Sequence, residues 1–159
     1  LTELRRQSFE VILGKYGYDP KRSYDLMEEF LNFRHEISID PDVEACLQNL
    51  HGKYKLAALT NGNANVMRLK IGKYFDAHFS SEQVGVQKPH RRIFDHVSIT
   101  LNIPHHFILH VGDNPVDDVK GALDSGFKAV WINRSRMEWP MELLSHEEIQ
   151  DLSQLSELV

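Results

Sequence analysis

The sequence lacks the features that mark several classes of protein. Cys46 is the only cysteine among 159 residues, so neither an internal disulfide nor a cysteine-based zinc site can form. A reducing cytoplasm is the expected location. No apolar run approaches the roughly 20 residues needed to cross a bilayer, so no membrane partner is expected. The net charge is -5 with acids and bases mixed along the chain, which argues against a nucleic-acid partner.

The composition is that of a globular domain with a sizeable core. Hydrophobic residues make up 42% of the chain and the mean hydropathy is -0.39, and the length suits one domain, alone or with a small appendage. The first residue is Leu1 and not methionine, and a helical pattern begins at once. We therefore expect that the start of the protein is missing or trimmed.

Two kinds of pattern divide the chain near residue 40. Apolar residues recur at helical spacing over residues 1–17 and 21–37, which predicts an antiparallel helical pair. Continuous apolar strands then alternate with helices, which indicates an α/β fold with a parallel sheet covered on both faces. The tail is expected to be a last helix or a loosely docked end. The expected strands are 55–60, 77–81, 107–113 and 128–133, and the expected helices are 66–73, 90–102 and 115–125.

The first candidate site follows the strand in "LAALTNGN", residues 56–63. Ligands of open parallel sheets bind beyond the carboxyl ends of the strands. Thr60 supplies a hydroxyl there, and Asn61 and Gly62 supply backbone N–H groups before a helix, which together suit a phosphate. The alternative is that Thr60 or Asn61 only caps the helix.

Two further charged groups are expected at the same edge of the sheet. Lys88 precedes a proline, which favours an extended backbone just before a helix, and its ammonium could neutralise a phosphate or a carboxylate nucleophile. The alternative is an ordinary solvated lysine. Asp113 ends the strand in "HVGDNPVDD" and suits a hard cation such as Mg²⁺, which takes one or two carboxylates. A hydroxyl, a cation and a metal-binding acid are the parts of a phosphoryl-transfer site.

The acids that follow Asp113 have a simpler explanation. Asn114 is a good N-cap, a proline suits the first helical position, and Asp117 and Asp118 in the first turn complement the helix dipole. His110, within the preceding strand, is expected to pack with its ring bonded to the backbone, and the alternative is a catalytic role.

The order of "LAALTNGN", "VQKP" and "HVGDNPVDDVKGALDSGF" resembles the second, third and fourth motifs of the haloacid dehalogenase-like hydrolase superfamily, over about residues 40–135. The sequences "TNGN" and "HVGD" within these motifs further resemble those of bacterial phosphatases of the flavin-biosynthesis branch, which act on flavin mononucleotide or its ribitylaminouracil phosphate precursor. The resemblance implies a Rossmann-like α/β core over residues 39–159 and part of a helical cap over residues 1–38.

The resemblance also implies roles for single residues. Thr60 would hydrogen-bond the phosphoryl group, helped by the N–H groups of Asn61 and Gly62. Lys88 would balance the charge between phosphate and nucleophile. Asp113 would hold Mg²⁺, and Asp118 would support the metal or Lys88. Asp117 has no counterpart role and is expected to be solvated, and Asn114 stands where some relatives carry a second acid.

The first motif of the family, a strand ending in Asp-x-Asp-x-Thr, has no match in this sequence. In the family its first aspartate attacks phosphorus and the second acts as general acid and base. "SIDPDVE" has two acids at that spacing, but no apolar strand precedes Asp40. The family places this strand between those that end here at Thr60 and Asp113. We therefore expect this chain to be a C-terminal portion without turnover of its own, with about 50–70 upstream residues supplying the nucleophile.

Two functions follow as hypotheses. The first is a Mg²⁺-dependent phosphomonoester hydrolase, in its intact form, acting on a small phosphorylated metabolite. The alternative is a non-catalytic phosphate- or partner-binding module that has lost its nucleophile. Dehalogenase chemistry also occurs in the superfamily but would not need Mg²⁺.

Overall fold

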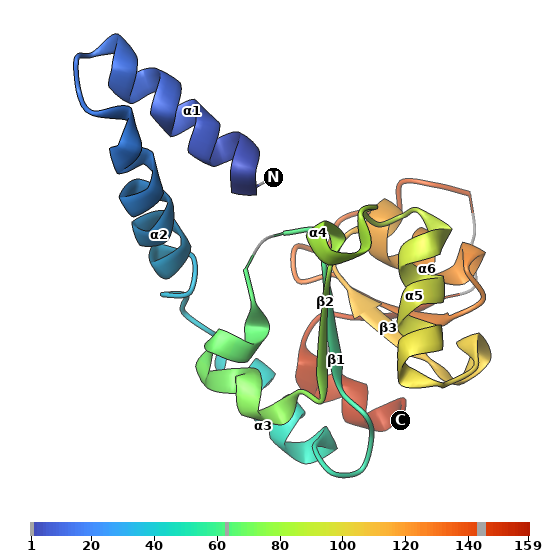
Figure 1. The fold of residues 1–159 in the computed structure, drawn as a ribbon. Helices are drawn as coiled ribbons and strands as arrows, with labels where there is room; N and C mark the ends of the chain where they lie inside the picture. The colour runs from blue at the N-terminus through green and yellow to red at the C-terminus, as the bar shows by residue number, and fades with distance from the viewer. Residues whose placement is uncertain (1, 63, 143–145) are drawn as a thin grey trace.

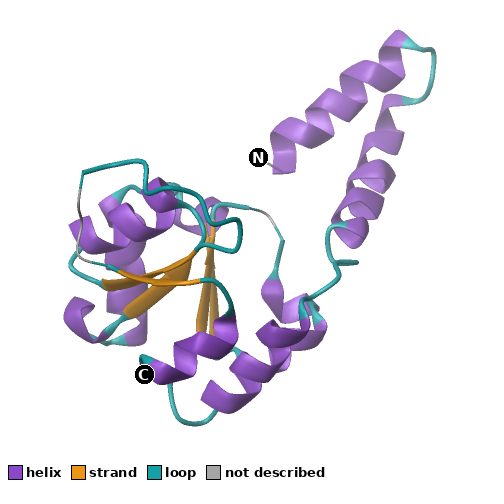
Figure 2. Cartoon of the chain, turned by 180° about the vertical axis from the view of Figure 1, so that it is seen from behind, coloured by secondary structure: helices purple, strands orange, loops and turns teal. Residues whose placement is uncertain are grey.

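The computed structural model describes residues 2–62, 64–142 and 146–159. A pair of helices extends away from a body in which short strands are flanked by helices (Figure 1), and the opposite view shows the same separation (Figure 2). The division falls where the sequence pattern changes from helical to alternating. No helix among the described residues is long and apolar enough to cross a membrane.

The two helices expected near the N-terminus are present as α1 (Thr2–Lys15) and α2 (Ser23–Phe33). They run antiparallel and meet through an edge-to-face contact between Phe9 and Phe30, with ring centroids 6.4 Å apart. Met27 is buried in α2, whereas α1 has no buried residue among those described. Because so few of their residues are buried, the two helices of this hairpin pack on one side only. Its assignment to a helical cap stays a prediction.

The body is α/β, as the sequence predicts, but its strands form two parallel sheets and not one. One sheet has two strands in the order β1-β2, and the other has three in the order β3-β4-β5. Among the described residues, β1 and β3 therefore make no ladder with each other. The strands are β1 (Ala57–Thr60), β2 (Ala77–Ser80), β3 (Leu109–Gly112), β4 (Lys128–Ile132) and β5 (Glu147–Ile149).

Most of the expected helices are confirmed. The described helices of the body are α3 (Pro41–Leu50), α4 (Ser81–Val84), α5 (Arg91–Leu101) and α6 (Gly121–Asp124), and α6 continues a wider π-helical turn, η5 (Pro115–Lys120). Short 3-10 segments complete the list: η1 (Pro20–Arg22), η2 (Val66–Arg68), η3 (Lys70–Tyr74), η4 (His105–Phe107) and η6 (Leu152–Glu157).

Two expectations about elements need correction. The helix expected over residues 66–73 is the pair η2 and η3. Gly72 lies so close to this turn that an added Cβ would be 2.8 Å from the carbonyl oxygens of Val66 and Met67. The tail ends in a last helix, η6, but it begins with strand β5, which pairs with β4, and it is not loosely docked because Ile149 and Leu155 are both buried.

The core lies on both faces of the three-stranded sheet. On one face α5 and η5 contribute Ile93, Phe94 and Val119, which pack with Trp131 of β4. On the other face the residues Leu50, Val130, Ile149 and Leu155 form a second cluster. Trp131 is a core residue, and Trp139 packs over it with ring centroids 5.1 Å apart.

Strands β1 and β3 are less buried than their apolar sequences predict. Ala129, Val130 and Trp131 of β4 are buried, whereas every residue of β1 and of β3 is only half-buried. The two strands border the same open space, because Leu56, Ala57 and Leu59 line one side of a cavity and Leu109 and Val111 line another. The side chains and ladder edges of β1 and β3 that face this space are thus left uncovered by the described chain.

Candidate active site

Lys88 is a buried cation at the end of β1. Its side chain is 10% exposed, and its Nζ donates to the carbonyl oxygen of Leu59 at 2.9 Å and to Asp118 Oδ1 at 2.6 Å. Since Leu59 belongs to β1 and Asp118 to the helix after β3, this ammonium joins the ends of the two sheets. The solvated lysine considered from the sequence alone is excluded.

Asp118 is the centre of the charged cluster. Its Oδ1 also contacts His110 Nε2 at 3.0 Å, and its Oδ2 accepts from the backbone N–H of Asn114 at 3.0 Å. Burial alone would raise the pKa of Asp118, but the hydrogen bond from His110 and the charge and hydrogen bond of Lys88 hold that pKa well below its usual range. Asp118 is therefore a carboxylate whose two oxygens are both engaged by the protein.

The strand that carries His110 is shaped to admit this carboxylate. A Cβ added at Gly112 would lie 2.3 Å from Asp118 Cγ, a distance shorter than real Cβ atoms show to their neighbours. The expectation that the ring of His110 bonds the backbone was wrong: it bonds Asp118 and meets the ring of Phe94 edge-on at 5.6 Å. His110 and Gly112 together fix the rotamer of Asp118.

Asn61 uses its side chain to hold the backbone of Lys88. Its Oδ1 accepts from the N–H of Lys88 at 2.7 Å, and its Nδ2 donates to the carbonyl of Lys88 at 3.0 Å. The same Nδ2 donates to Asp117 Oδ2 at 3.2 Å. Asp117 is half-buried against Asn61 and is not the solvated acid expected from the sequence.

Thr60 lies at the carboxyl end of β1, as predicted, and is half-buried. Its Oγ1 accepts from the backbone N–H of Gly62 at 2.9 Å. The hydroxyl and the tight turn are therefore one unit, directly beside the Leu59 carbonyl that receives Lys88. Asn63, the last residue of the expected turn, lies outside the described residues.

Asp113 is exposed at the end of β3. The buried indole of Trp131 donates from Nε1 to its carbonyl oxygen at 3.0 Å, which fixes the backbone of Asp113 while its side chain remains accessible. Asn114 caps the following helix, as expected, because its Oδ1 accepts from the N–H groups of Val116 and Asp117, both at 2.9 Å.

The donor set suits Mg²⁺ only in part. Mg²⁺ takes one or two carboxylates and otherwise keeps water and substrate oxygens, and Asp113 offers one accessible carboxylate. No group of three or more His, Cys, Asp or Glu side chains among the described residues could hold a metal ion. Asp118 is committed to Lys88, His110 and Asn114, so its geometry favours support of Lys88 over direct metal binding.

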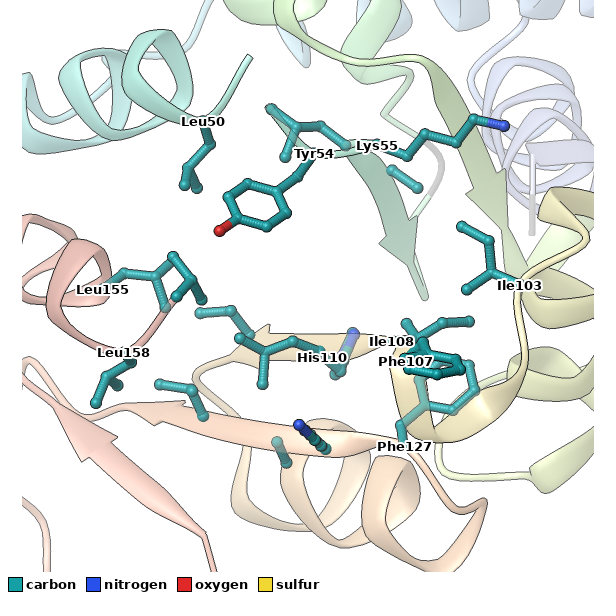
Figure 3. Close-up of a pocket in the computed structure, with 18 of the residues that line it drawn as sticks. Leu50, Tyr54, Lys55, Ile103, Phe107, Ile108, His110, Phe127, Leu155 and Leu158 are labelled. Atoms are coloured by element: carbon teal, nitrogen blue, oxygen red, sulfur yellow. The ribbon is translucent and has the colours of Figure 1, made fainter. Parts of the chain in front are cut away.

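A cavity of about 970 Å³ lies between β1 and β3. Figure 3 shows Leu50, Tyr54, Leu155 and Leu158 at one end, Ile103, Phe107, Ile108 and Phe127 at the other, and His110 between them. Because His110 contacts Asp118, the cavity reaches the charged cluster. Its lining is otherwise mainly apolar.

The sequence alone predicted that Thr60, Lys88 and Asp113 meet at one edge of the sheet, and the family resemblance added Asp118 as a supporting residue. Neither revealed three supporting contacts. The missed contacts are those of His110 with Asp118, of the Asn61 side chain with Lys88, and of Trp131 with Asp113. For the contact of His110 with Asp118, the only signal in the sequence was that His110 comes three residues before the strand-end acid Asp113. The other two join segments too far apart in sequence for a local pattern to reveal them.

Comparison with known proteins agrees with this geometry. A family model described as haloacid dehalogenase-like hydrolase matches residues 4–126. The 5-amino-6-(5-phospho-D-ribitylamino)uracil phosphatase YigB of Escherichia coli (strain K12) is 36% identical over 167 aligned residues, covering 100% of this chain and 70% of that protein. A phosphoserine phosphatase of Thermus thermophilus is 35% identical over 136 residues, covering 82% of this chain and 55% of that protein.

Among solved structures, a 2-haloacid dehalogenase from Pseudomonas syringae pv. Tomato DC3000 superimposes with a TM-score of 0.90 at 35% identity. It covers 99% of this chain, and the match spans 70% of that chain. The family match, the two phosphatase relatives and this fold confirm the resemblance read from the three motifs. The chain belongs to the haloacid dehalogenase-like hydrolase family.

Proposed function

We propose that this chain forms the phosphate- and metal-binding part of a Mg²⁺-dependent phosphomonoester hydrolase. The observation that carries the proposal is the buried Lys88–Asp118 pair, which sets one ammonium beside Thr60 and within a short chain of contacts from Asp113. Phosphoryl transfer depends mainly on positioning and on neutralising charge, and these residues supply both.

The residues of this chain have separate tasks in the proposed reaction. The Thr60 hydroxyl and the N–H groups of the Asn61–Gly62 turn would bind oxygens of the phosphoryl group, with Thr60 turning from its present bond to Gly62. Lys88 would face both the phosphate and an attacking carboxylate, and Asp118 would hold it there. Asn61 would fix the backbone of Lys88, as its two hydrogen bonds do now.

Asp113 is the proposed Mg²⁺ ligand. A divalent cation held there would offset the negative charge of the phosphate. The bond from Trp131 to the carbonyl of Asp113 would keep this acid at the mouth of the site. Asp118 would contribute through Lys88 and not as a direct ligand.

We further propose that the nucleophile, an aspartate, arrives on a strand held in the cavity between β1 and β3. Three observations support this: the half-burial of both strands, the absence of a ladder between them among the described residues, and the apolar lining of the cavity. A parallel strand there would pair with both edges, and unsatisfied buried backbone groups cost about 1–3 kcal/mol each. Its carboxyl end would place a side chain between Thr60 and Asp113.

In the proposed chemistry this carboxylate attacks phosphorus, the phosphorus–oxygen bond of the ester breaks, and the departing alkoxide takes its proton from a second aspartate on the same incoming segment, which acts as general acid. Water then hydrolyses the acyl phosphate and returns the carboxylate. In this proposal residues 1–159 hold and orient the phosphate, and the attacking group comes from outside them. We propose that they have no turnover on their own.

The substrate is proposed to be a small phosphorylated metabolite in the cytoplasm. Two of the relatives act, by their names, on 5-amino-6-(5-phospho-D-ribitylamino)uracil and on phosphoserine, so these compounds and flavin mononucleotide are the first to test. The half-buried free thiol of Cys46 suits a reducing compartment.

A second candidate is a binding module that holds phosphate without hydrolysing it. The observation in its favour is that Asp117 and Asp118, the two acids at the start of η5, are both engaged by the protein. The deciding experiment is phosphate release from the three compounds by the whole protein as its gene encodes it, titrated with Mg²⁺. We expect Mg²⁺-dependent release that Asp113→Asn reduces by orders of magnitude, whereas no release from any compound would favour the binding module.

A further inference from the structure

The space above Gly62 is bounded by a hydroxyl and by a guanidinium from the helical hairpin. A Cβ added at Gly62 would lie 3.2 Å from Thr60 Oγ1 and 3.5 Å from Arg34 Nη2. One small atom in that position would therefore touch both groups. Arg34 directly follows α2, so a residue 26 positions before Thr60 in the chain reaches the turn that follows β1.

Two further contacts tie the end of α2 to η2, the segment that follows this turn. His35 Nε2 accepts from the backbone N–H of Asn65 at 3.1 Å, and Arg68 Nη2 donates to Asn32 Oδ1 at 3.1 Å. His35 is anchored in turn, because its Nδ1 bonds the carbonyl of Leu31 at 2.5 Å. Since Nε2 accepts, Nδ1 carries the proton and donates. These bonds are made by residues on either side of Arg34 in the chain, so they fix the backbone around Arg34 relative to η2.

The charge of Arg34 is available to a ligand. No carboxylate among the described residues forms an ion pair with it within 4.0 Å, whereas Arg6, Arg91 and Arg134 each have an acidic partner. A guanidinium presents several N–H donors in one plane, which suits the oxygens of a phosphate. Thr60 and Gly62 offer the complementary hydroxyl and backbone groups.

We propose that Arg34 binds an oxygen of the substrate's phosphoryl group together with Thr60. The inference rests on the proposed function and deepens it, because it assigns a phosphate contact to the hairpin and not to the α/β body. Phosphate binding would then depend on how the hairpin sits on the turn at Gly62. Substrate and hairpin position are coupled through one side chain.

The test compares Arg34→Met, which keeps most of the length and removes the charge, with Arg34→Lys, which keeps a charge without the planar donors. Arg22→Met is the matched control. Arg22 precedes α2 and Arg34 follows it, so the 11-residue helix separates them by about 18 Å along its axis. The full chain is titrated with inorganic phosphate in the presence of Mg²⁺, and binding is measured by calorimetry. Urea midpoints show whether each variant folds as the wild type does.

We expect Arg34→Met to weaken phosphate binding about 10-fold to 100-fold, the range for losing a charged hydrogen bond, and Arg34→Lys to recover part of it. Arg22→Met should bind as the wild type does. In the whole protein, the KM for p-nitrophenyl phosphate should rise more than kcat falls. Unchanged phosphate affinity in Arg34→Met, beside normal Mg²⁺-dependent hydrolysis, would overturn this inference and leave the proposed function standing. Wild-type protein that binds no phosphate would overturn both.

Discussion

The Lys88–Asp118 pair gives the sharpest prediction about stability. Asp118→Asn keeps the shape of the side chain and removes its charge, so the ammonium of Lys88 stays buried with only the carbonyl of Leu59 as its remaining strong partner. Removing one member of a buried ion pair costs about 3–5 kcal/mol, because the other charge is left uncompensated. A domain of this kind has only about 5–15 kcal/mol of stability in all.

The free energy of unfolding is measured by urea denaturation at neutral pH. Asp118→Asn should lower it by about 3–5 kcal/mol, and adding Lys88→Met should recover most of that loss, because an uncharged pair of similar volume is often close to neutral. Asp124→Asn is the matched control on the same helical segment. Its partner Lys120 is exposed, so the loss should stay below about 1 kcal/mol. A loss below about 1 kcal/mol in Asp118→Asn, or no recovery in the double variant, would refute this reasoning.

Three further predictions use the same cluster. Gly112→Ala should strongly lower the free energy of unfolding measured by urea denaturation, because the new Cβ would lie 2.3 Å from Asp118 Cγ. Gly14→Ala is the control: the atom nearest its Cβ would be 3.8 Å away, so this change should be neutral or stabilising by about 0.5–1 kcal/mol. The folded pKa of Asp118 lies below its unfolded value of about 3.9, so its contribution should be present above about pH 4 and be lost as the pH falls further. Urea midpoints measured down to acidic pH should therefore fall less steeply in Asp118→Asn, and parallel curves would contradict the assignment. Trp131→Phe removes the donor to the carbonyl of Asp113 and should raise the Mg²⁺ concentration for half-maximal activity more than it lowers activity at saturating Mg²⁺; an unchanged Mg²⁺ titration would show that the bond does not position Asp113.

Much of the fold could be predicted because its signals are local. The strand-end positions of Thr60 and Asp113, the cap at Asn114 and the helix around Phe94 follow from apolar runs and capping chemistry. The short strand β5 (Glu147–Ile149) could not be predicted, because two of its three residues are glutamates and only its pairing with β4 makes it a strand. The pairing with β4, and not the intrinsic β-propensity of these residues, determines this strand.

The positions of the proposed site residues at the strand ends could be predicted, whereas their contacts could not. The sequence places Lys88 before a proline but gives no reason for its burial, which comes from Asp118 and the carbonyl of Leu59. Asp117 and Asp118 look alike as first-turn acids, yet the helix turns one towards Asn61 and the other into the cluster. The split into two sheets could not be predicted either, because the apolar sequences of β1 and β3 are both typical of fully buried strands.

The proposal that the nucleophile comes from outside residues 1–159 is tested most directly by comparing their turnover with that of the whole protein that the gene encodes. Phosphate release from 5-amino-6-(5-phospho-D-ribitylamino)uracil is measured with saturating Mg²⁺ at equal protein concentration. We predict that the whole protein releases phosphate and that residues 1–159 bind inorganic phosphate without turnover, because in our proposal the attacking carboxylate enters on a strand between β1 and β3. Equal turnover by the two proteins would contradict that central claim.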